Sequence, residues 1–328
     1  ALPPTEPPTA APPTVPAGPL PVSAVISADN AADLVEFQNI YIAPTAIVSA
    51  PFSPTALQVA SFGFDKLVRV WDIANDTSVA LAYELSGHTE SGFALSYSPD
   101  GSTLASGAGD FTVRLWDPAT GRSLKTIRTQ SDVYRIVWSP DSTRMAFVGY
   151  LNSRIFVIDP DSGREISQIR SGNTILWSVA YSPDGTMLAA ADNDGVVTIY
   201  DGENYSEINQ VSTGQGAGWD MEFSPDNSLL ASCNASGKAM IWRTDSWARV
   251  ATIEAHSGEC TDGVFTPNGE VYFTVGADGN LNAWDPRSGA QLNRIYFGRY
   301  LWWVSVSPAG DLISVANDDG TLRILGIR

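Results

Sequence analysis

The chain has 328 residues, of which 44% are hydrophobic and 17% are charged, so it can bury a large core. Its net charge of −17 disfavours binding to the phosphate backbone, and we therefore expect no nucleic-acid partner. The sequence has no apolar run of about 18 residues, so it predicts no membrane-spanning helix.

Residues 1–21 differ in composition from the rest of the chain. Nine of these 21 residues are proline, most others are alanine or threonine, and Glu6 carries the only charge. Such a segment favours extended polyproline II conformation and cannot build a core. The composition predicts a Pro/Thr-rich arm or linker over residues 1–21, followed by one folded domain over residues 22–328.

The start of the chain also suggests a location. It begins with Ala1 and not with Met, and a Pro/Thr spacer before a folded domain is typical of exported and lipid-anchored proteins. We therefore expect an extracellular or cell-surface protein, compatible with a lipid anchor upstream of residue 1, in preference to a cytoplasmic one. The alternative is that residue 1 is a boundary inside a longer protein.

Three markers recur along the chain at a period of about 42 residues. An aromatic or apolar residue followed by Ser or Thr and then Pro occurs seven times, ending at Pro54, Pro99, Pro140, Pro183, Pro225, Pro267 and Pro308. A second marker falls at Trp71, Trp116, Ile158, Tyr200, Trp242, Trp284 and Leu325. A third lies at Leu85, Ile127, Ile169, Val211, Ile253 and Ile295, each 42 residues from the next. A fixed period of this length indicates a repeat architecture.

Each period has the pattern of four short strands. In the second repeat we expect strands over residues 93–98, 103–106, 112–116 and 123–127, separated by turn residues such as Asp100-Gly101. Short strands at this spacing are typical of a sandwich, a barrel or a propeller. The period of 42 residues selects the propeller, with one four-stranded blade per repeat. The sequence therefore predicts an all-β, seven-bladed β-propeller.

The second repeat resembles a WD40 repeat. Its Gly87-His88, Ser98-Pro99-Asp100-Gly101 and Trp116-Asp117 match that pattern. In WD40 proteins a His, a Ser or Thr, an Asp and a Trp form a buried hydrogen-bonded chain that stiffens the blade. The resemblance assigns this role to two tetrads, His88, Ser106, Asp110 and Trp116, and His256, Thr274, Asp278 and Trp284. Residues 34–328 are thus identified as a WD40-repeat propeller, which we interpret as an exported member of bacterial type.

The ring has to be closed by the N-terminal part of the domain. The seventh repeat offers strands near 302–307, 312–316 and 321–325, and the sequence then ends at Arg328 without a fourth strand. Residues 35–40 have the fourth-strand pattern, and Ile40 precedes Pro54 by the same 14 residues that separate Leu85 from Pro99. We expect this strand to complete the last blade, which removes the exposed edges of an open ring.

The remaining polar residues suggest no catalytic chemistry. The only two histidines occupy tetrad positions, and no base accompanies a nucleophile elsewhere in the pattern. We therefore expect no enzyme activity, no metal and no cofactor. Cys233 and Cys260 fall at the ends of strands in adjacent blades, so a bridge is geometrically possible, but two buried free thiols are the favoured interpretation.

One position in each repeat predicts a binding surface. The residues six before each repeat proline are Val48, Phe93, Tyr134, Trp177, Trp219, Thr261 and Trp302. By resemblance to WD40 proteins, this position opens the innermost strand at the channel mouth on the top face, where partner peptides bind. Five of the seven residues are aromatic, which predicts an exposed aromatic ring with an acidic rim that includes Asp220, Glu259 and Asp262. The alternative is that the rings tip inward and plug the channel.

Two functions fit these features. The first is a non-enzymatic protein–protein interaction module, a subunit of a larger assembly that docks through its top face and its Pro-rich arm. The second is an aromatic-lined binding protein for a glycan, or for a cationic or proline-rich peptide.

Overall fold

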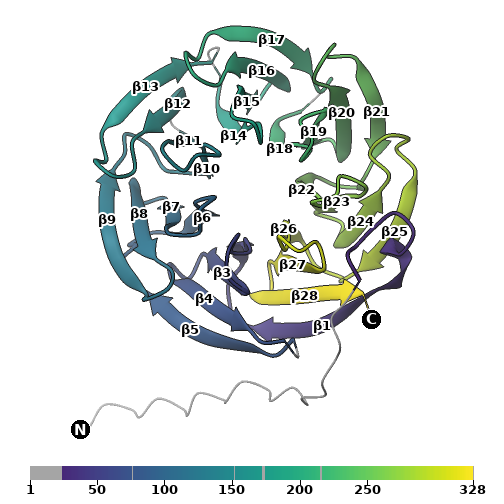
Figure 1. The fold of residues 1–328 in the computed structure, drawn as a ribbon, viewed down its shortest axis with the longest axis horizontal. Coiled ribbons are helices and arrows are strands. Elements are labelled where there is room, and N and C mark those ends of the chain that lie inside the picture. Colours follow the sequence, from purple (N-terminus) through teal and green to yellow (C-terminus); the bar gives the residue numbers. More distant parts are fainter. Residues whose placement is uncertain (1–23, 76, 151, 172–173, 215, 328) are drawn as a thin grey trace, which may run out of the picture.

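The structure is a computed structural model that describes residues 24–327 with the exception of 76, 151, 172–173 and 215. Seven four-stranded antiparallel sheets stand around a central channel like the blades of a propeller (Figure 1). The prediction of an all-β, seven-bladed β-propeller is confirmed. The predicted arm at residues 1–21 lies outside the described residues.

The first four blades follow the repeats in chain order. Blade 1 contains β2 (Ile47–Ser49), β3 (Gln58–Gly63), β4 (Val68–Ile73) and β5 (Val79–Leu85). Blade 2 contains β6 (Gly92–Tyr97), β7 (Leu104–Ala108), β8 (Thr112–Asp117) and β9 (Arg122–Arg128). Blade 3 contains β10 (Arg135–Trp138), β11 (Met145–Gly149), β12 (Asn152–Ile158) and β13 (Glu165–Arg170). Blade 4 contains β14 (Leu176–Tyr181), β15 (Met187–Asp192), β16 (Val196–Asp201) and β17 (Glu207–Ser212).

The last three blades complete the ring. Blade 5 contains β18 (Gly218–Phe223), β19 (Leu229–Asn234), β20 (Lys238–Arg243) and β21 (Arg249–Glu254). Blade 6 contains β22 (Cys260–Phe265), β23 (Tyr272–Gly276), β24 (Asn280–Trp284) and β25 (Gln291–Tyr296). Blade 7 contains β26 (Leu301–Val306), β27 (Leu312–Asn317), β28 (Thr321–Ile327) and β1 (Leu34–Tyr41). A 3₁₀ turn, η1 (Ala31–Asp33), precedes β1; among the described residues no helix is long and apolar enough to cross a membrane.

The core lies between neighbouring blades. The second strands are buried on both faces, as in β7, where every residue is buried, whereas the outermost strands such as β9 are largely exposed. Val113 of blade 2, for example, belongs to the same buried cluster as Phe147 of blade 3. Each sheet packs between two others, so its inner strands are apolar on both faces.

The repeated Ser-Pro-Asp motif forms the turn between the first and second strands. The Ser98 hydroxyl donates to Asp100 Oδ1 (2.6 Å) and accepts from the Thr103 amide (3.0 Å), while Gly101 adopts a φ of 72°. The hydrogen bond from Ser98 lowers the pKa of Asp100. The same Ser–Asp pairing occurs at Ser182 with Asp184, at 2.7 Å. The Ser–Asp turn thus recurs in blades 2, 3, 4 and 5 at the period of the sequence.

The N-terminal strand closes the ring as predicted. Strand β1 pairs antiparallel with β28, from Leu34 opposite Ile327 to Tyr41 opposite Thr321. Arg323 of β28 also contacts Glu36 of β1, with 2.7 Å between Nη1 and Oε2. The last blade therefore consists of both ends of the domain, and the outer edge of β28 is covered.

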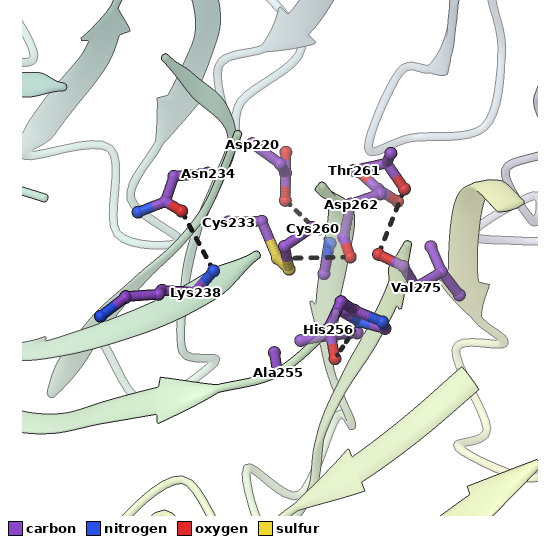
Figure 2. Close-up of a disulfide and its surroundings, with 12 residues drawn as sticks. Asp220, Cys233, Asn234, Lys238, Ala255, His256, Cys260, Thr261, Asp262 and Val275 are labelled. Carbon is purple, nitrogen blue, oxygen red and sulfur yellow. Dashed lines mark hydrogen bonds between the residues drawn. A yellow bond between two sulfur atoms is a disulfide. The ribbon is translucent and has the colours of Figure 1, made fainter. Parts of the chain in front are cut away.

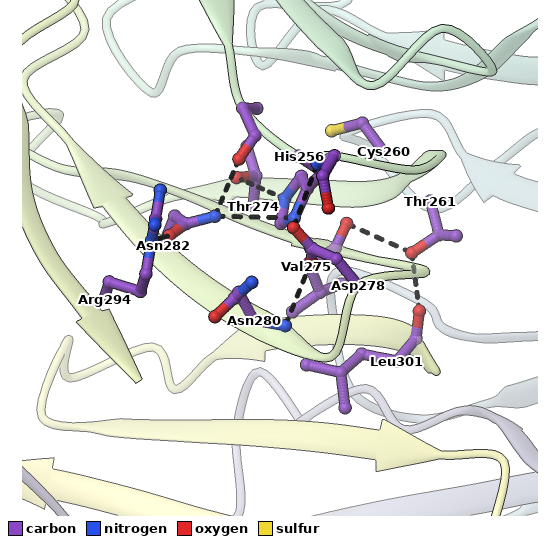
Figure 3. Close-up of polar contacts among 12 residues, drawn as sticks. His256, Cys260, Thr261, Thr274, Val275, Asp278, Asn280, Asn282, Arg294 and Leu301 are labelled. Carbon is purple, nitrogen blue, oxygen red and sulfur yellow. Dashed lines mark hydrogen bonds and ion pairs between the residues drawn. The ribbon is translucent and has the colours of Figure 1, made fainter. Parts of the chain in front are cut away.

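Both predicted tetrads are present as hydrogen-bonded chains. In blade 2 the His88 ring lies 2.9 Å from Asp110 and 2.8 Å from Ser106, whose hydroxyl accepts from the Trp116 indole at 2.8 Å. Blade 6 repeats this arrangement, with the His256 ring 2.8 Å from Asp278 and 2.9 Å from Thr274 (Figure 3). The Thr274 hydroxyl accepts from the Trp284 indole at 2.9 Å. Burial lowers the pKa of both histidines, and the paired carboxylates oppose this shift only in part.

The two cysteines form a disulfide. Cys233 at the end of β19 is joined to Cys260 at the start of β22, which links blades 5 and 6 (Figure 2). The favoured interpretation of two free thiols is therefore wrong. The strand positions of both cysteines were predicted, but their pairing depends on the distance between two separate sheets.

Candidate binding site at the channel mouth

The seven positions that lie six residues before the repeat prolines surround one cavity. Its volume is about 320 Å³, and it opens at the end of the channel where the first strand of each blade begins. Its lining includes all seven predicted residues, Val48, Phe93, Tyr134, Trp177, Trp219, Thr261 and Trp302, together with Phe64, Tyr300 and Trp303. The cavity volume lies at the lower end of the range for ligand pockets.

The aromatic side chains of the wall contact one another in sequence around the mouth. Phe93 stacks on Tyr134 with 4.4 Å between ring centroids, and Trp177 lies 5.5 Å from Tyr134 and 4.6 Å from Trp219. Phe64 bridges the rings of Phe93 and Trp302, at 6.1 and 6.0 Å. We define Phe64, Phe93, Tyr134, Trp177, Trp219 and Trp302 as the aromatic ring.

The side chains of the aromatic ring are half-buried, which corrects the expectation of substantial exposure. Each ring covers part of its neighbour, because adjacent first strands bring these residues within stacking distance. They still surround an open cavity, so they do not fill the mouth completely.

A buried ion cluster forms the floor of the cavity. The Arg135 guanidinium contacts Asp220 and lies 3.2 Å from Asp262 Oδ1, and it also stacks over the Trp303 ring at 4.4 Å. The second oxygens of the two aspartates accept from the Gly263 and Val304 amides, at 3.1 and 2.9 Å. The prediction that Asp220 and Asp262 form an acidic rim is wrong, because both carboxylates are buried below the aromatic ring.

Glu259, the third predicted rim residue, lies beside Tyr300 in the wall of the cavity. It lines the cavity and accepts the Tyr300 hydroxyl, with 2.7 Å between Oε2 and the phenol oxygen. Burial, reinforced by this hydrogen bond, raises the pKa of Tyr300 above its usual range.

The ion cluster also separates the two mouths of the channel. A second cavity of about 340 Å³ shares Arg135, Asp262 and Trp303 with the first and continues toward the opposite mouth, where it reaches Glu222. Arg135, Asp220 and Asp262 all lie five residues before a repeat proline, one position after the aromatic ring. This shared position relative to the repeat prolines could have identified the three residues as a group. It does not show that their side chains meet across the channel.

Burial shifts the pKa values of the floor groups. It raises the pKa of Glu222 well above its usual range, and the charge of Asp220 adds to this effect. Burial also raises the pKa of Asp262, with Asp220 adding and Arg135 opposing. For Arg135 burial acts to lower the pKa, but Asp220 and Asp262 outweigh it and raise the pKa.

Glu222 should make stability depend on pH. Because the folded protein holds its proton more tightly than the unfolded chain, the stabilisation is present below pH 4.5 and is lost as the pH rises toward the folded pKa. We expect the free energy of unfolding of the wild type to fall relative to Glu222→Gln by up to about 1.4 kcal/mol per pH unit in that window. Urea titrations between pH 4.5 and 8 measure it. Exposed Glu203→Gln is the control, and an equal pH trend for both variants would contradict the assignment.

Three of the tryptophans that line the cavity have unpaired indole N–H groups. Trp177 donates to Asn193 Oδ1 at 3.1 Å. The Nε1 atoms of Trp219, Trp302 and Trp303 are buried and have no acceptor among the described residues. An unpaired buried donor costs about 1–3 kcal/mol, so an acceptor that reached these shielded N–H groups would offset that cost.

Comparison with known proteins places the chain in a family. Residues 46–326 match the family model described as the first β-propeller of IFT122. The chain is 37% identical over 92 residues to the small ribosomal subunit protein RACK1 of Neurospora crassa, covering 27% of this chain and 28% of that protein. It is 36% identical over 92 residues to MST50-interacting protein 11 of Pyricularia oryzae, covering 27% and 28%. It is 33% identical over 100 residues to THO complex subunit 3 of Arabidopsis thaliana, covering 30% and 32%. The alignments thus span about a third or less of these relatives.

The relatives overturn the predicted location. They are eukaryotic proteins and include a small ribosomal subunit protein, a THO complex subunit and a ribosome biogenesis protein, which point away from the cell exterior. The prediction of an extracellular or cell-surface protein is therefore wrong, and the bacterial type finds no support. The composition of residues 1–21 does not by itself identify a compartment.

The fold and the family agree with each other. The match covers most of the seven blades, each of which corresponds to one period of the sequence. The relatives include proteins named as complex subunits and as an interacting protein. The chain belongs to the WD40-repeat β-propeller family, within which it matches the model of the first propeller of IFT122.

Proposed function

We propose that this chain is a non-enzymatic protein–protein interaction module that serves as a subunit of a larger assembly. In this proposal it has two parts, a Pro-rich arm at residues 1–21 and a propeller at residues 22–328, and it docks through the channel mouth and the arm. The cavity inside the aromatic ring carries the proposal, because it combines apolar walls with unpaired donors. Trp and Tyr are also the residues most enriched at binding hot spots.

A glycan is the second candidate ligand. Sugar rings can stack on Trp faces such as those of Trp177 and Trp219, and both rings line the cavity. Recognition of sugar hydroxyls also needs several free polar side chains, however, and the charged groups of the floor are already paired with one another. The geometry therefore favours a peptide, and a glycan array tests the alternative.

Truncation of two adjacent rings tests the proposal. We expect Trp177→Ala with Trp219→Ala to abolish capture of co-purifying subunits, because loss of hot-spot residues costs about 2 kcal/mol or more each. Thermal unfolding should change little, since both side chains line a cavity and are half-buried. Co-purification and melting temperature are measured on the same samples.

The control is Tyr296→Ala, which removes an aromatic side chain that is 70% exposed on an outermost strand. This variant should keep its co-purifying partners and the melting temperature of the wild type. A large fall in the melting temperature of the double variant would show that the rings plug the channel. Continued co-purification of partners with the double variant would contradict the proposed site.

A further inference from the structure

The aromatic walls of the cavity favour a ligand that brings hydrogen-bond acceptors. An indole N–H only donates, and those of Trp219, Trp302 and Trp303 have no acceptor among the described residues. The carboxylates of the floor are already occupied, since Asp220 and Asp262 each bind Arg135 and a backbone amide. A cationic ligand would supply further donors to a site whose donors are already in excess.

A proline-rich segment has this chemistry. Proline has no N–H group, and the polyproline II helix makes no internal hydrogen bonds, so its carbonyl oxygens are free to accept. Its pyrrolidine rings pack against aromatic faces, which is the usual mode by which such segments are recognised. The three N–H groups are shielded within the packed rings, so a carbonyl reaches them when the rings rotate, a common change of interface side chains on binding.

This chain carries such a segment itself. Residues 1–21 contain nine prolines, with the spacing Pro-x-x-Pro at residues 4–7, 13–16 and 16–19. Glu6 is the only charged residue there, so docking the central and C-terminal prolines would bury no charge. The aromatic cavity and the proline-rich arm are therefore chemically complementary.

Ile26, five residues after the arm, lies at the face opposite the cavity. The Ile26 amide donates to Gly310 O in the turn after β26, at 2.8 Å, and Asn268 donates to Ile26 O from the turn after β22, at 3.0 Å. Trp302, which lines the cavity, lies at the start of β26. A six-residue strand spans roughly 20 Å. The chain between Pro19 and residue 24 spans at most roughly 16 Å in polyproline II conformation, so the last two prolines of the arm, Pro19 and Pro21, are too close to residue 24 to reach the cavity of their own propeller.

We propose that the channel-mouth cavity binds the Pro-rich arm, residues 1–21, of a second copy of this chain. The inference rests on the proposed function, because it takes the cavity to be a docking site. Since the described residues that follow the arm contact the face opposite the cavity, each contact between copies joins unlike surfaces and leaves one arm and one cavity free. Such head-to-tail contacts extend into open chains whose length depends on concentration.

A synthetic peptide of residues 1–21 tests the ligand. Isothermal titration into dilute full-length protein should show saturable binding at one site, and replacing all nine prolines by alanine should weaken it at least about tenfold. Binding should change little between 50 and 500 mM salt, because the peptide carries one charge. A missing signal, or equal binding of the alanine peptide, overturns the proposal, and so does preferential, salt-sensitive binding of a lysine-rich peptide.

A conservative protein variant tests the unpaired donors. Trp219→Phe with Trp302→Phe keeps both aromatic faces and removes two N–H groups, and it should weaken peptide binding about tenfold. Trp247→Phe, in the turn between β20 and β21, is the matched control and should bind like the wild type. Melting temperatures confirm that the variants are folded. Unchanged binding by the double variant would remove the basis for an acceptor-rich ligand.

Sedimentation velocity of the full chain tests the second copy. The weight-average mass should rise with protein concentration and return to that of the monomer with excess peptide. A monomer at all concentrations that still binds the peptide would place the arm in its own cavity and overturn the docking between copies. If the peptide does not bind but Trp177→Ala with Trp219→Ala still loses its partners, the inference fails while the proposed function stands.

Discussion

Replacement of Arg135 by methionine is expected to destabilise the propeller by about 3–5 kcal/mol, the usual cost of removing one partner from a buried ion pair. Arg135 is the cation on which Asp220 and Asp262 converge, and Glu222 lines the adjoining cavity. Methionine retains much of the packing against Trp303 but leaves two buried carboxylates without a positive charge. Urea unfolding at pH 7 measures the loss.

Two further variants separate charge from packing. Arg122→Met removes an exposed arginine from an outermost strand and should change stability by less than about 0.5 kcal/mol. Adding Asp220→Asn and Asp262→Asn to Arg135→Met should restore part of the loss, because the uncompensated charges are removed. Similar losses for Arg122→Met and Arg135→Met would show that the cluster contributes nothing specific.

Removal of residues 1–40 is expected to destabilise the whole ring. The deletion removes nearly all of β1 and with it the outer strand of the last blade, including the buried side chains of Leu34 and Phe37. Burial of these two side chains alone contributes about 3–6 kcal/mol, and the edge of β28 would also be left unpaired. Differential scanning calorimetry should show a markedly lower melting temperature.

The matched deletion removes residues 1–21 only. It leaves η1, β1 and the buried Ile26 in place, so the melting temperature measured at low protein concentration should remain close to that of the full chain. Equal melting temperatures for the two deletion variants would contradict the role of β1 in closing the ring.

Local sequence patterns were sufficient to predict the blades, their closure and the positions around the mouth. The turn after each first strand depends on neighbours within a few residues, such as Ser98 with Asp100, so it recurs wherever the motif recurs. Alternation along a strand then fixes the register, and counting from the repeat prolines identifies the residues of the cavity wall.

Matching the sequence to the complete WD40 tetrad missed one hydrogen bond of the same kind, that of Trp71. Its indole donates to Ser61 at 2.9 Å in a blade without a histidine.

Contacts across the ring could not be predicted from the sequence. Arg135 meets Asp220 and Asp262, which lie 85 and 127 residues further along the chain, because the radius of the closed ring brings three blades together at the channel. The disulfide depends on the distance between blades 5 and 6 in the same way. The period of the sequence determined how many blades there are and where each residue enters them. Only the closed ring decided which side chains stack, which charges are buried and which indole N–H groups have no acceptor in the described part of the chain. These features depend on distances between sheets and on the directions of side chains.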